Sequence, residues 1–191
     1  MKYLIIFIIL LAMSFTAFAQ TQEKEEKITP AKNEFKIDAF DLAFMRAFDV
    51  SYERVDNQNM GYGVSLLLNF QDDDLYYEKF AVTPFFRMYF FNKQDYGARG
   101  FFAEVYTKFA SGENPEDYYE PVYDNNNHSS TYKEYYHDFF DVSFGMALGW
   151  KWVNKNGFTL DVSLGGGRYL GFDKHSPEFS GRGGVSFGYR F

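Results

Sequence analysis

Cysteine is absent from the sequence, which excludes disulfide bonds, thiolate metal sites and the lipid-modified cysteine that some bacterial export signals require. Positive charge is scarce as well, because 19 Lys and Arg stand against 26 Asp and Glu and the net charge is -7. Nucleic acid needs a basic face, so it is not expected as a partner. No catalytic signature or metal-ligand spacing is present, and we expect neither a cofactor nor a metal.

Aromatic residues are abundant, at 22% of 191 residues with 24 Phe and 16 Tyr. This chain length allows one domain. The aromatic content exceeds what a small water-soluble core needs, and an exposed aromatic surface would aggregate in water. These residues must therefore be placed in an apolar environment.

The first 19 residues have the pattern of a secretory signal peptide. A lysine precedes an apolar run from Tyr3 to Met13, and small residues follow up to Ala17-Phe18-Ala19. The run is short for a membrane span, so cleavage is favoured over the alternative of an amino-terminal anchor helix. Residues 20–33 are charged and non-aromatic, which predicts a flexible lead-in to a domain at 34–191.

Residues 139–153, FFDVSFGMALGWKWV, alternate with a period of two. One face carries large apolar residues and ends in two tryptophans, and the other carries small residues with Asp141 and Lys151. A water-soluble sheet also alternates, but glycine and alanine are unusual on a solvent-exposed face. Large apolar residues with terminal Trp suit lipid, and small or charged residues suit the interior of a narrow barrel.

The same alternation recurs along the chain and predicts strands of the length that a tilted membrane crossing needs. No stretch after the signal peptide resembles a membrane-spanning helix. The predicted fold is all-β: an eight-stranded antiparallel transmembrane β-barrel, an up-and-down meander. The expected strands are 34–44, 47–56, 60–70, 79–91, 99–110, 139–153, 157–169 and 182–191.

Two of these strands are irregular. Asp38 and Asp41 fall on opposite faces of the first strand, and Pro84 would remove a ladder hydrogen bond from the fourth. A bulge is therefore expected in each strand.

The connections predict the orientation of the barrel. With a periplasmic amino terminus, the inner turns are DNQN, NKQDYG and NKNG, while the outer connections include QDDDLYYE, the long segment 111–138 and LGFDKHSPEFSG. Short inner turns and long outer loops are typical of outer-membrane barrels. The first outer connection, near Met45, is short and does not add support.

Nine charged residues have the inward parity. An eight-stranded barrel is only wide enough to be filled by side chains, and buried charges need partners. We therefore expect an ion-pair network that plugs the barrel, with a gated polar path as the alternative. The residues are Asp49, Glu53, Arg87, Glu104, Lys108, Asp141, Lys151, Asp161 and Arg190.

The chain ends in GRGGVSFGYRF, where Phe187, Tyr189 and Phe191 alternate with small or charged residues. This ending resembles the carboxy-terminal signal that the barrel-insertion machinery reads, which makes that machinery an expected partner and predicts that the last strand closes against the first. Along a tilted strand each residue climbs about 2.3–2.7 Å. Arg168 then lies about the height of the apolar band above Phe158, and we expect it to contact outer-membrane lipid headgroups.

The outer segment 111–138 contains seven acids and one lysine. Its tyrosines suit an adaptable contact surface or an aromatic belt, and the ligand of such a surface is unknown. They are Tyr118, Tyr119, Tyr123, Tyr132, Tyr135 and Tyr136.

A hydrolase acting on lipid is the enzymatic alternative, because a serine could be activated by a histidine within hydrogen-bond reach. The candidates are His128, Ser129, Ser130, His137 and His175. His128 lies among turn-forming residues that would not hold a catalytic geometry, so no catalytic residue is expected. The acid run Asp72–Asp74 is favoured as a solvated loop over a cation site.

Several stretches resemble a known family. DVSYERVDNQNMGYGVSL, AVTPFFRMYF, MALGWKWVNKNGFTLDVSLGGG and GRGGVSFGYRF are similar to the small outer-membrane β-barrel family of unknown function found in Bacteroidetes-type bacteria. The resemblance runs from about Phe35 to Phe191. It implies a fold and a location, and it carries no catalytic residues.

The expected function is accordingly that of a monomeric outer-membrane barrel, not an enzyme, with a structural or surface-interaction role. A soluble secreted barrel that binds a ligand is a further alternative. Such a barrel would bury its aromatic residues and expose its charges.

Overall fold

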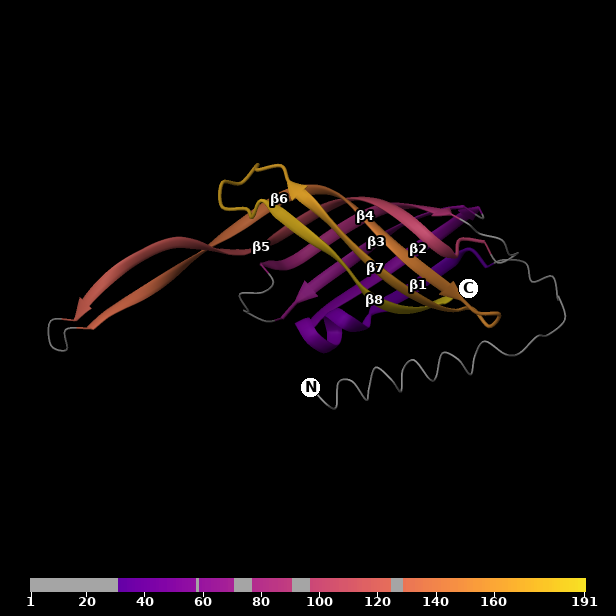
Figure 1. The fold of residues 1–191 in the computed structure, drawn as a ribbon, viewed down its shortest axis with the longest axis horizontal. Helices are drawn as coiled ribbons and strands as arrows, with labels where there is room; N and C mark the ends of the chain where they lie inside the picture. Colours follow the sequence, from indigo (N-terminus) through magenta and orange to yellow (C-terminus); the bar gives the residue numbers. More distant parts are fainter. Residues whose placement is uncertain (1–30, 58, 71–76, 91–96, 125–128) are drawn as a thin grey trace.

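Eight antiparallel strands form one closed barrel in sequence order (Figure 1). The computed structural model describes residues 31–57, 59–70, 77–90, 97–124 and 129–191, with the backbone alone for 57, 115–124 and 129–135. The strands are β1 (Asn33–Asp38), β2 (Ala47–Asn57), β3 (Met60–Asn69), β4 (Glu78–Phe90), β5 (Gly100–Asp124), β6 (Ser129–Val153), β7 (Phe158–Tyr169) and β8 (Phe179–Arg190). The eight-stranded meander that the alternation predicts is confirmed.

The barrel closes between β1 and β8. Ile37 pairs with Phe187 and Phe35 with Tyr189 in an antiparallel ladder. The predicted closure of the last strand against the first is therefore confirmed. β1 begins and β8 ends at the same end of the barrel, which is called here the terminal end. The opposite end, where β5 and β6 extend beyond the barrel, is called the hairpin end.

The first strand is shorter than predicted. β1 ends at Asp38, and a π-helical turn, η1 (Asp41–Met45), follows it in place of the expected extension to residue 44. The Oδ1 atom of Asp38 accepts the N–H groups of Phe40 and Asp41 at 2.8 and 3.2 Å, so this side chain bends the backbone out of the sheet. The expected bulge is thus an exit from the barrel wall. No helix in the described ranges is long and apolar enough to cross a membrane.

Pro84 does not produce the bulge that its chemistry suggested. It pairs with Val64 without a register shift, and on the other side Val82 pairs with Phe109 and Phe85 with Tyr106 in one unbroken register. The irregularity in β4 lies between Glu78 and Phe80 instead. Thr83 and Pro84 themselves have no paired residue on β5. A proline fits at this position because a backbone donor toward β5 is not needed there.

The expected long connection at 111–138 is mostly strand. The β5–β6 pairing continues from the barrel to Asp124 and Ser129, whereas β4 pairs with β5 only as far as Gly112. The two strands therefore leave the wall as a two-stranded hairpin that projects far beyond the barrel (Figure 1). The backbone ladder, which composition does not reveal, keeps the register of the barrel as far as Glu116 and shifts between Glu116 and Glu120. Residues 125–128 lie outside the described residues.

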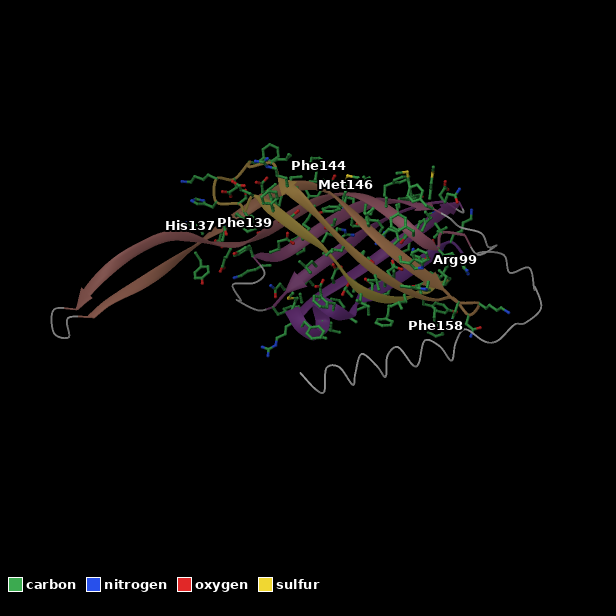
Figure 2. The ribbon with its side chains drawn as sticks, in the orientation of Figure 1. Arg99, His137, Phe139, Phe144, Met146 and Phe158 are labelled. Carbon is green, nitrogen blue, oxygen red and sulfur yellow. The ribbon has the colours of Figure 1, made fainter. Side chains whose placement is uncertain are left out.

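The two faces of the wall have the predicted characters. On β6, Phe144, Met146 and Leu148 are 54–62% exposed, whereas Ala147 is 2% exposed. Phe144 and Met146 point away from the barrel in Figure 2. The small inward positions leave room for neighbours, since a Cβ on Gly145 would lie 2.3 Å from the ring of Tyr106. The alternation on β6 therefore separates an apolar exterior from a tightly filled interior.

Apolar groups close both ends of the interior. At the hairpin end, Phe139 packs edge-on against Tyr169, with 5.9 Å between ring centroids. They belong to a buried cluster with Ala47, Leu67, Ala81 and Ala110. At the terminal end the buried cluster is Val55, Tyr89, Ala98 and Phe102. Charged side chains fill the space between these two clusters.

Candidate functional site

Glu53 is the centre of the interior charge network. Its Oε2 atom lies 2.6 Å from Nζ of Lys36, 2.8 Å from Nζ of Lys151 and 3.0 Å from Nη1 of Arg87. Its Oε1 atom accepts the hydroxyl of Tyr89 at 2.5 Å. One fully buried carboxylate thus holds together cations from β1, β4 and β6, because a buried charge is tolerated only with such partners.

Asp161 supplies the second bridging carboxylate. Its Oδ2 atom lies 2.8 Å from Nζ of Lys36 and 2.6 Å from Nη1 of Arg87. Because Asp161 is on β7, the bridge joins walls that are far apart in the sequence. The network therefore crosses the lumen rather than following one strand.

The terminal end is tied to this network through Glu34. Its carboxylate lies 2.8 Å from Nζ of Lys151 and pairs with the guanidinium of Arg190. Arg190 also donates to the carbonyls of Gly97 and Ala98, each at 2.9 Å. Gly97 and Ala98, just before β5, are therefore tied to the barrel interior, where Ala98 is fully buried.

Glu104 extends the network toward the hairpin end. It accepts from Nε of Arg87 and from Nε of Arg182, both at 2.5 Å. Arg87 lies over the rings of Phe102 and Phe85 at 4.3 and 4.7 Å, and such contacts favour a cation. The guanidinium planes are therefore fixed by both carboxylates and rings.

A small chamber lies between the network and the hairpin-end cluster. Serines and glycines line one side of it, and Asp38, Asp41, Asp49, Glu78, Lys108 and Arg182 contribute charge. Lys108 pairs with Glu78 at 2.7 Å and also donates to the carbonyl of Gly181 at 2.7 Å. Asp38 accepts the hydroxyl of Ser186 at 2.8 Å.

Asp41 is a buried acid of this chamber that lies outside the strands. Its side chain is 6% exposed, and burial together with the neighbouring Asp38 raises its pKa from 3.8 to about 6. Desolvation disfavours the charged carboxylate, and a nearby carboxylate disfavours it further. The hairpin end of the interior therefore holds more acid than its cations neutralise.

Seven of the nine predicted interior residues lie in ion pairs, namely Glu53, Arg87, Glu104, Lys108, Lys151, Asp161 and Arg190. Asp49 is half-buried and lines the chamber. Asp141 is buried, but it accepts the hydroxyl of Ser176 and the N–H of Gly171. It therefore anchors the β7–β8 connection instead of joining the network.

The alternation in the sequence did not identify four further interior charges: Glu34, Lys36, Glu78 and Arg182. Glu34 and Lys36 alternate correctly on β1, but the false extension of that strand obscured which face was inward. Glu78 lies beside the β4 bulge. Arg182 falls in a glycine-rich stretch, GRGG, with little apolar pattern.

The β7–β8 connection, residues 170–178, is fixed to the barrel rim by side chains. Besides the contacts of Asp141, Asp173 accepts the backbone N–H of Phe140 at 3.3 Å, and Asn114 donates to the carbonyl of His175 at 2.9 Å. Backbone N–H groups and the adjacent His175 hold the pKa of Asp173 below its usual value. This connection is thus an ordered part of the rim.

The remaining predicted residues lie on the outside. Phe187, Tyr189 and Phe191 share the outward face of the last strand and are exposed, as is Tyr136 near the base of the hairpin. Arg168 is exposed on the outward face of β7. The side chains of the other five tyrosines lie outside the described residues.

Among the histidine and serine candidates, the side chains of His137 and His175 are described, and these two lie together. His137 stacks on His175 with 4.4 Å between ring centroids. Ser130 lies on the same strand as His137, and seven residues of strand span about 23 Å. His128 lies outside the described residues, as does the acid run 72–74.

The comparisons bring no relative to this arrangement. No protein-family model matches the sequence, and no curated protein or solved structure is significantly similar to it. The function is therefore inferred from three features of the molecule: the apolar exterior of the barrel, its filled interior and the ordered β7–β8 connection at the rim.

Proposed function

We propose that the protein is an integral outer-membrane β-barrel that displays the β5–β6 hairpin at the cell surface. The main support is the distribution of side chains, which is the reverse of that in a water-soluble protein: the outside is apolar and the inside is charged. Monomeric proteins in water rarely expose apolar patches beyond a few hundred Å². Exposed large apolar side chains occur on all eight strands, for example Phe35, Val64, Phe86 and Leu164.

The filled interior favours a structural or surface-interaction role over transport. Three cations surround Glu53, and apolar clusters cover both ends. Opening a path through this network would leave buried charges unpaired, at several kcal/mol for each. The proposal is therefore a closed, monomeric barrel without enzymatic activity, related to the small Bacteroidetes-type barrels that its sequence resembles.

The direction of the barrel is part of the same proposal. The terminal end faces the periplasm, after export through a cleaved signal peptide, and the hairpin end faces the exterior. Insertion machinery would recognise the last strand, whose Phe187, Tyr189 and Phe191 are exposed on the outward face.

The soluble ligand-binding alternative requires the opposite distribution of side chains. Such a barrel places apolar residues around a lumen, whereas here the largest fully buried side chains include Lys36, Lys151 and Glu53. Fractionation of cells tests the proposal directly. We expect the protein in membranes after carbonate extraction, with a mobility on gels that shifts on heating. Release of the protein into the carbonate supernatant would contradict membrane integration.

A further inference from the structure

A groove at the hairpin end lies between β6 at Phe144, the end of β7 and the β7–β8 connection. Apolar residues line part of it, and charged residues line the rest. The lining residues used here are Phe144, Arg168, Leu170, Lys174, Pro177 and Glu178. The groove encloses about 980 Å³ of space, including the part open to solvent. This is room for a headgroup rather than for a single ion.

Arg168 lies at the boundary between the apolar exterior and this groove. On β7 it pairs with Phe144 of β6 on one side and with Phe179 of β8 on the other. These phenylalanines are 55% and 71% exposed. A guanidinium between two exposed rings, at the end of an apolar belt, is placed where lipid tails give way to headgroups.

Three charged side chains of the groove have no hydrogen bond or ion pair among the described residues: Arg168, Lys174 and Glu178. Asp173 also lines the groove, but its carboxylate accepts the backbone N–H groups of Phe140 and His175. The charges left for a ligand are therefore two cations and one anion, which match a phosphate that carries an ammonium group. Charge-assisted hydrogen bonds from Arg and Lys to phosphate oxygens are short and strong. The carboxylate of Glu178 would accept from the ammonium.

The groove is built before any ligand arrives. Ser176 donates to Asp141 at 2.5 Å, and its N–H donates to the carbonyl of Asp173 at 3.2 Å. The N–H of Tyr169 donates to the carbonyl of Glu178 at 3.1 Å. Because these bonds fix both ends of the connection, Lys174 and Glu178 are presented from an ordered backbone, which lowers the entropy cost of binding.

We propose that this groove binds the headgroup of a phosphoethanolamine lipid in the outer leaflet. Arg168 and Lys174 bind the phosphate, Glu178 binds the ammonium, and Phe144 and Leu170 contact the start of the acyl chains. The inference rests on the proposed membrane location. It adds a specific headgroup site that the barrel architecture alone does not require.

The test measures retained lipid by native mass spectrometry on the full mature protein in detergent. Dioleoyl phosphatidylethanolamine, phosphatidylcholine and phosphatidylglycerol are each added in turn. The wild-type protein is expected to retain phosphatidylethanolamine most strongly, because choline cannot donate a hydrogen bond to Glu178 and glycerol has no positive charge. Equal retention of all three lipids would overturn the assignment of the headgroup.

Variants assign the roles of the groove residues. The double substitution Arg168→Gln and Lys174→Gln should weaken retention about tenfold, as expected for loss of charge-assisted bonds to phosphate. Glu178→Gln should reduce the preference for ethanolamine over glycerol while leaving phosphatidylglycerol binding intact. Arg46→Gln is the matched control, since Arg46 is an exposed cation at the same end and does not line the groove.

Two outcomes would reject the site while leaving the proposed function intact. One is unchanged retention in the double variant, provided that its gel mobility still shifts on heating, which shows a folded barrel. The other is complete displacement of the lipid by millimolar inorganic phosphate, which would show an anion site without lipid specificity. Failure of the proposed function would instead appear as a wild-type protein that does not integrate into membranes.

Discussion

The last residue of the chain pairs with the first residue of the first strand: Asn33 donates its N–H to the carbonyl of Phe191 at 3.0 Å, and Phe191 donates back at 2.8 Å. Phe191 therefore contributes to closure through its backbone, and its exposed ring is free to act in recognition. Phe191→Asp keeps both backbone bonds. We expect this variant to be exported but not inserted, so that it accumulates in the periplasm and is degraded.

Refolding without the insertion machinery separates these two roles of Phe191. Purified Phe191→Asp should fold into detergent micelles almost as the wild type does, because the ladder is unchanged. Phe172→Asp is the control in cells, as it places a charge at an exposed phenylalanine of the hairpin end. Normal insertion of Phe191→Asp into the outer membrane would show that the terminal ring is not read as a signal.

Glu53→Gln tests the interior network. Glutamine retains the shape but removes the charge that Lys36, Arg87 and Lys151 share. Loss of one partner from a buried ionic group costs about 3–5 kcal/mol. Urea unfolding in lipid vesicles, followed by tryptophan fluorescence, should show this loss. Arg54→Gln, the adjacent residue on the outward face, should change stability by less than about 1 kcal/mol; equal effects of both variants would show that the parity assignment is wrong.

Asp41 predicts a pH dependence of stability. Its pKa of about 6 in the folded protein lies above its ordinary value of 3.8. The folded state therefore binds the proton more tightly than the unfolded state does. The stabilisation by this proton is complete below about pH 4 and is lost as the pH rises through about 6. Its size is about 3 kcal/mol at most. Asp41→Asn should therefore stabilise the barrel at pH 8 and have little effect at pH 4.

Groups around Asp41 also titrate, so the informative quantity is the difference between wild type and variant across pH. The nearby charges are Asp38, Asp49, Glu78, Lys108 and Arg182. Asp56→Asn, at an exposed position near the terminal end, is the matched control for the loss of one carboxylate. A pH-independent difference for Asp41→Asn would contradict the raised pKa.

Excision of the projecting hairpin separates stability from display. Beyond Gly112, β5 no longer pairs with β4, so the outer part of the ladder joins β5 and β6 only to each other. Replacement of residues 116–135 by a short Gly-Ser linker should leave insertion and the heat-modified mobility nearly unchanged. It keeps Asn114 and His137, which contact the rim. Any binding of the cell surface to a partner through this protein should disappear. Unfolding of the shortened barrel would show that the hairpin is structural.

The strand alternation made most of the barrel predictable. Along β6, each residue changes face, so Asp141 and Lys151 could be placed inward from the letters alone. The list of interior charges was incomplete, in part because the alternation breaks after Asp38 and beside Glu78. Asp38 turns the chain by accepting backbone N–H groups, and a local side-chain bond of this kind leaves no periodic trace in the sequence.

The hairpin and the groove show a second limit. Residues 111–124 contain Pro115 and Pro121 and many polar residues, a composition that indicates a loop. Their pairing with β6 nevertheless continues the barrel ladder, with one register shift between Glu116 and Glu120. Arg168 could be placed at a rim from strand geometry. Its neighbour Lys174 could not, because the position of the β7–β8 connection depends on long-range bonds to Asp141 and Asn114.

Accessibility of spin labels on the outward face tests the proposed membrane barrel most directly. The chain has no cysteine, so single cysteines at Met146, Leu148 and Val162 can carry a nitroxide in protein reconstituted into lipid vesicles. These positions are exposed in mid-barrel, and Lys155 in the β6–β7 turn is the reference position. We expect labels at the three belt positions to collide with oxygen and to be shielded from a water-soluble nickel chelate, with the reverse at position 155. Belt labels that are as accessible to the chelate as position 155 would contradict a membrane-spanning barrel.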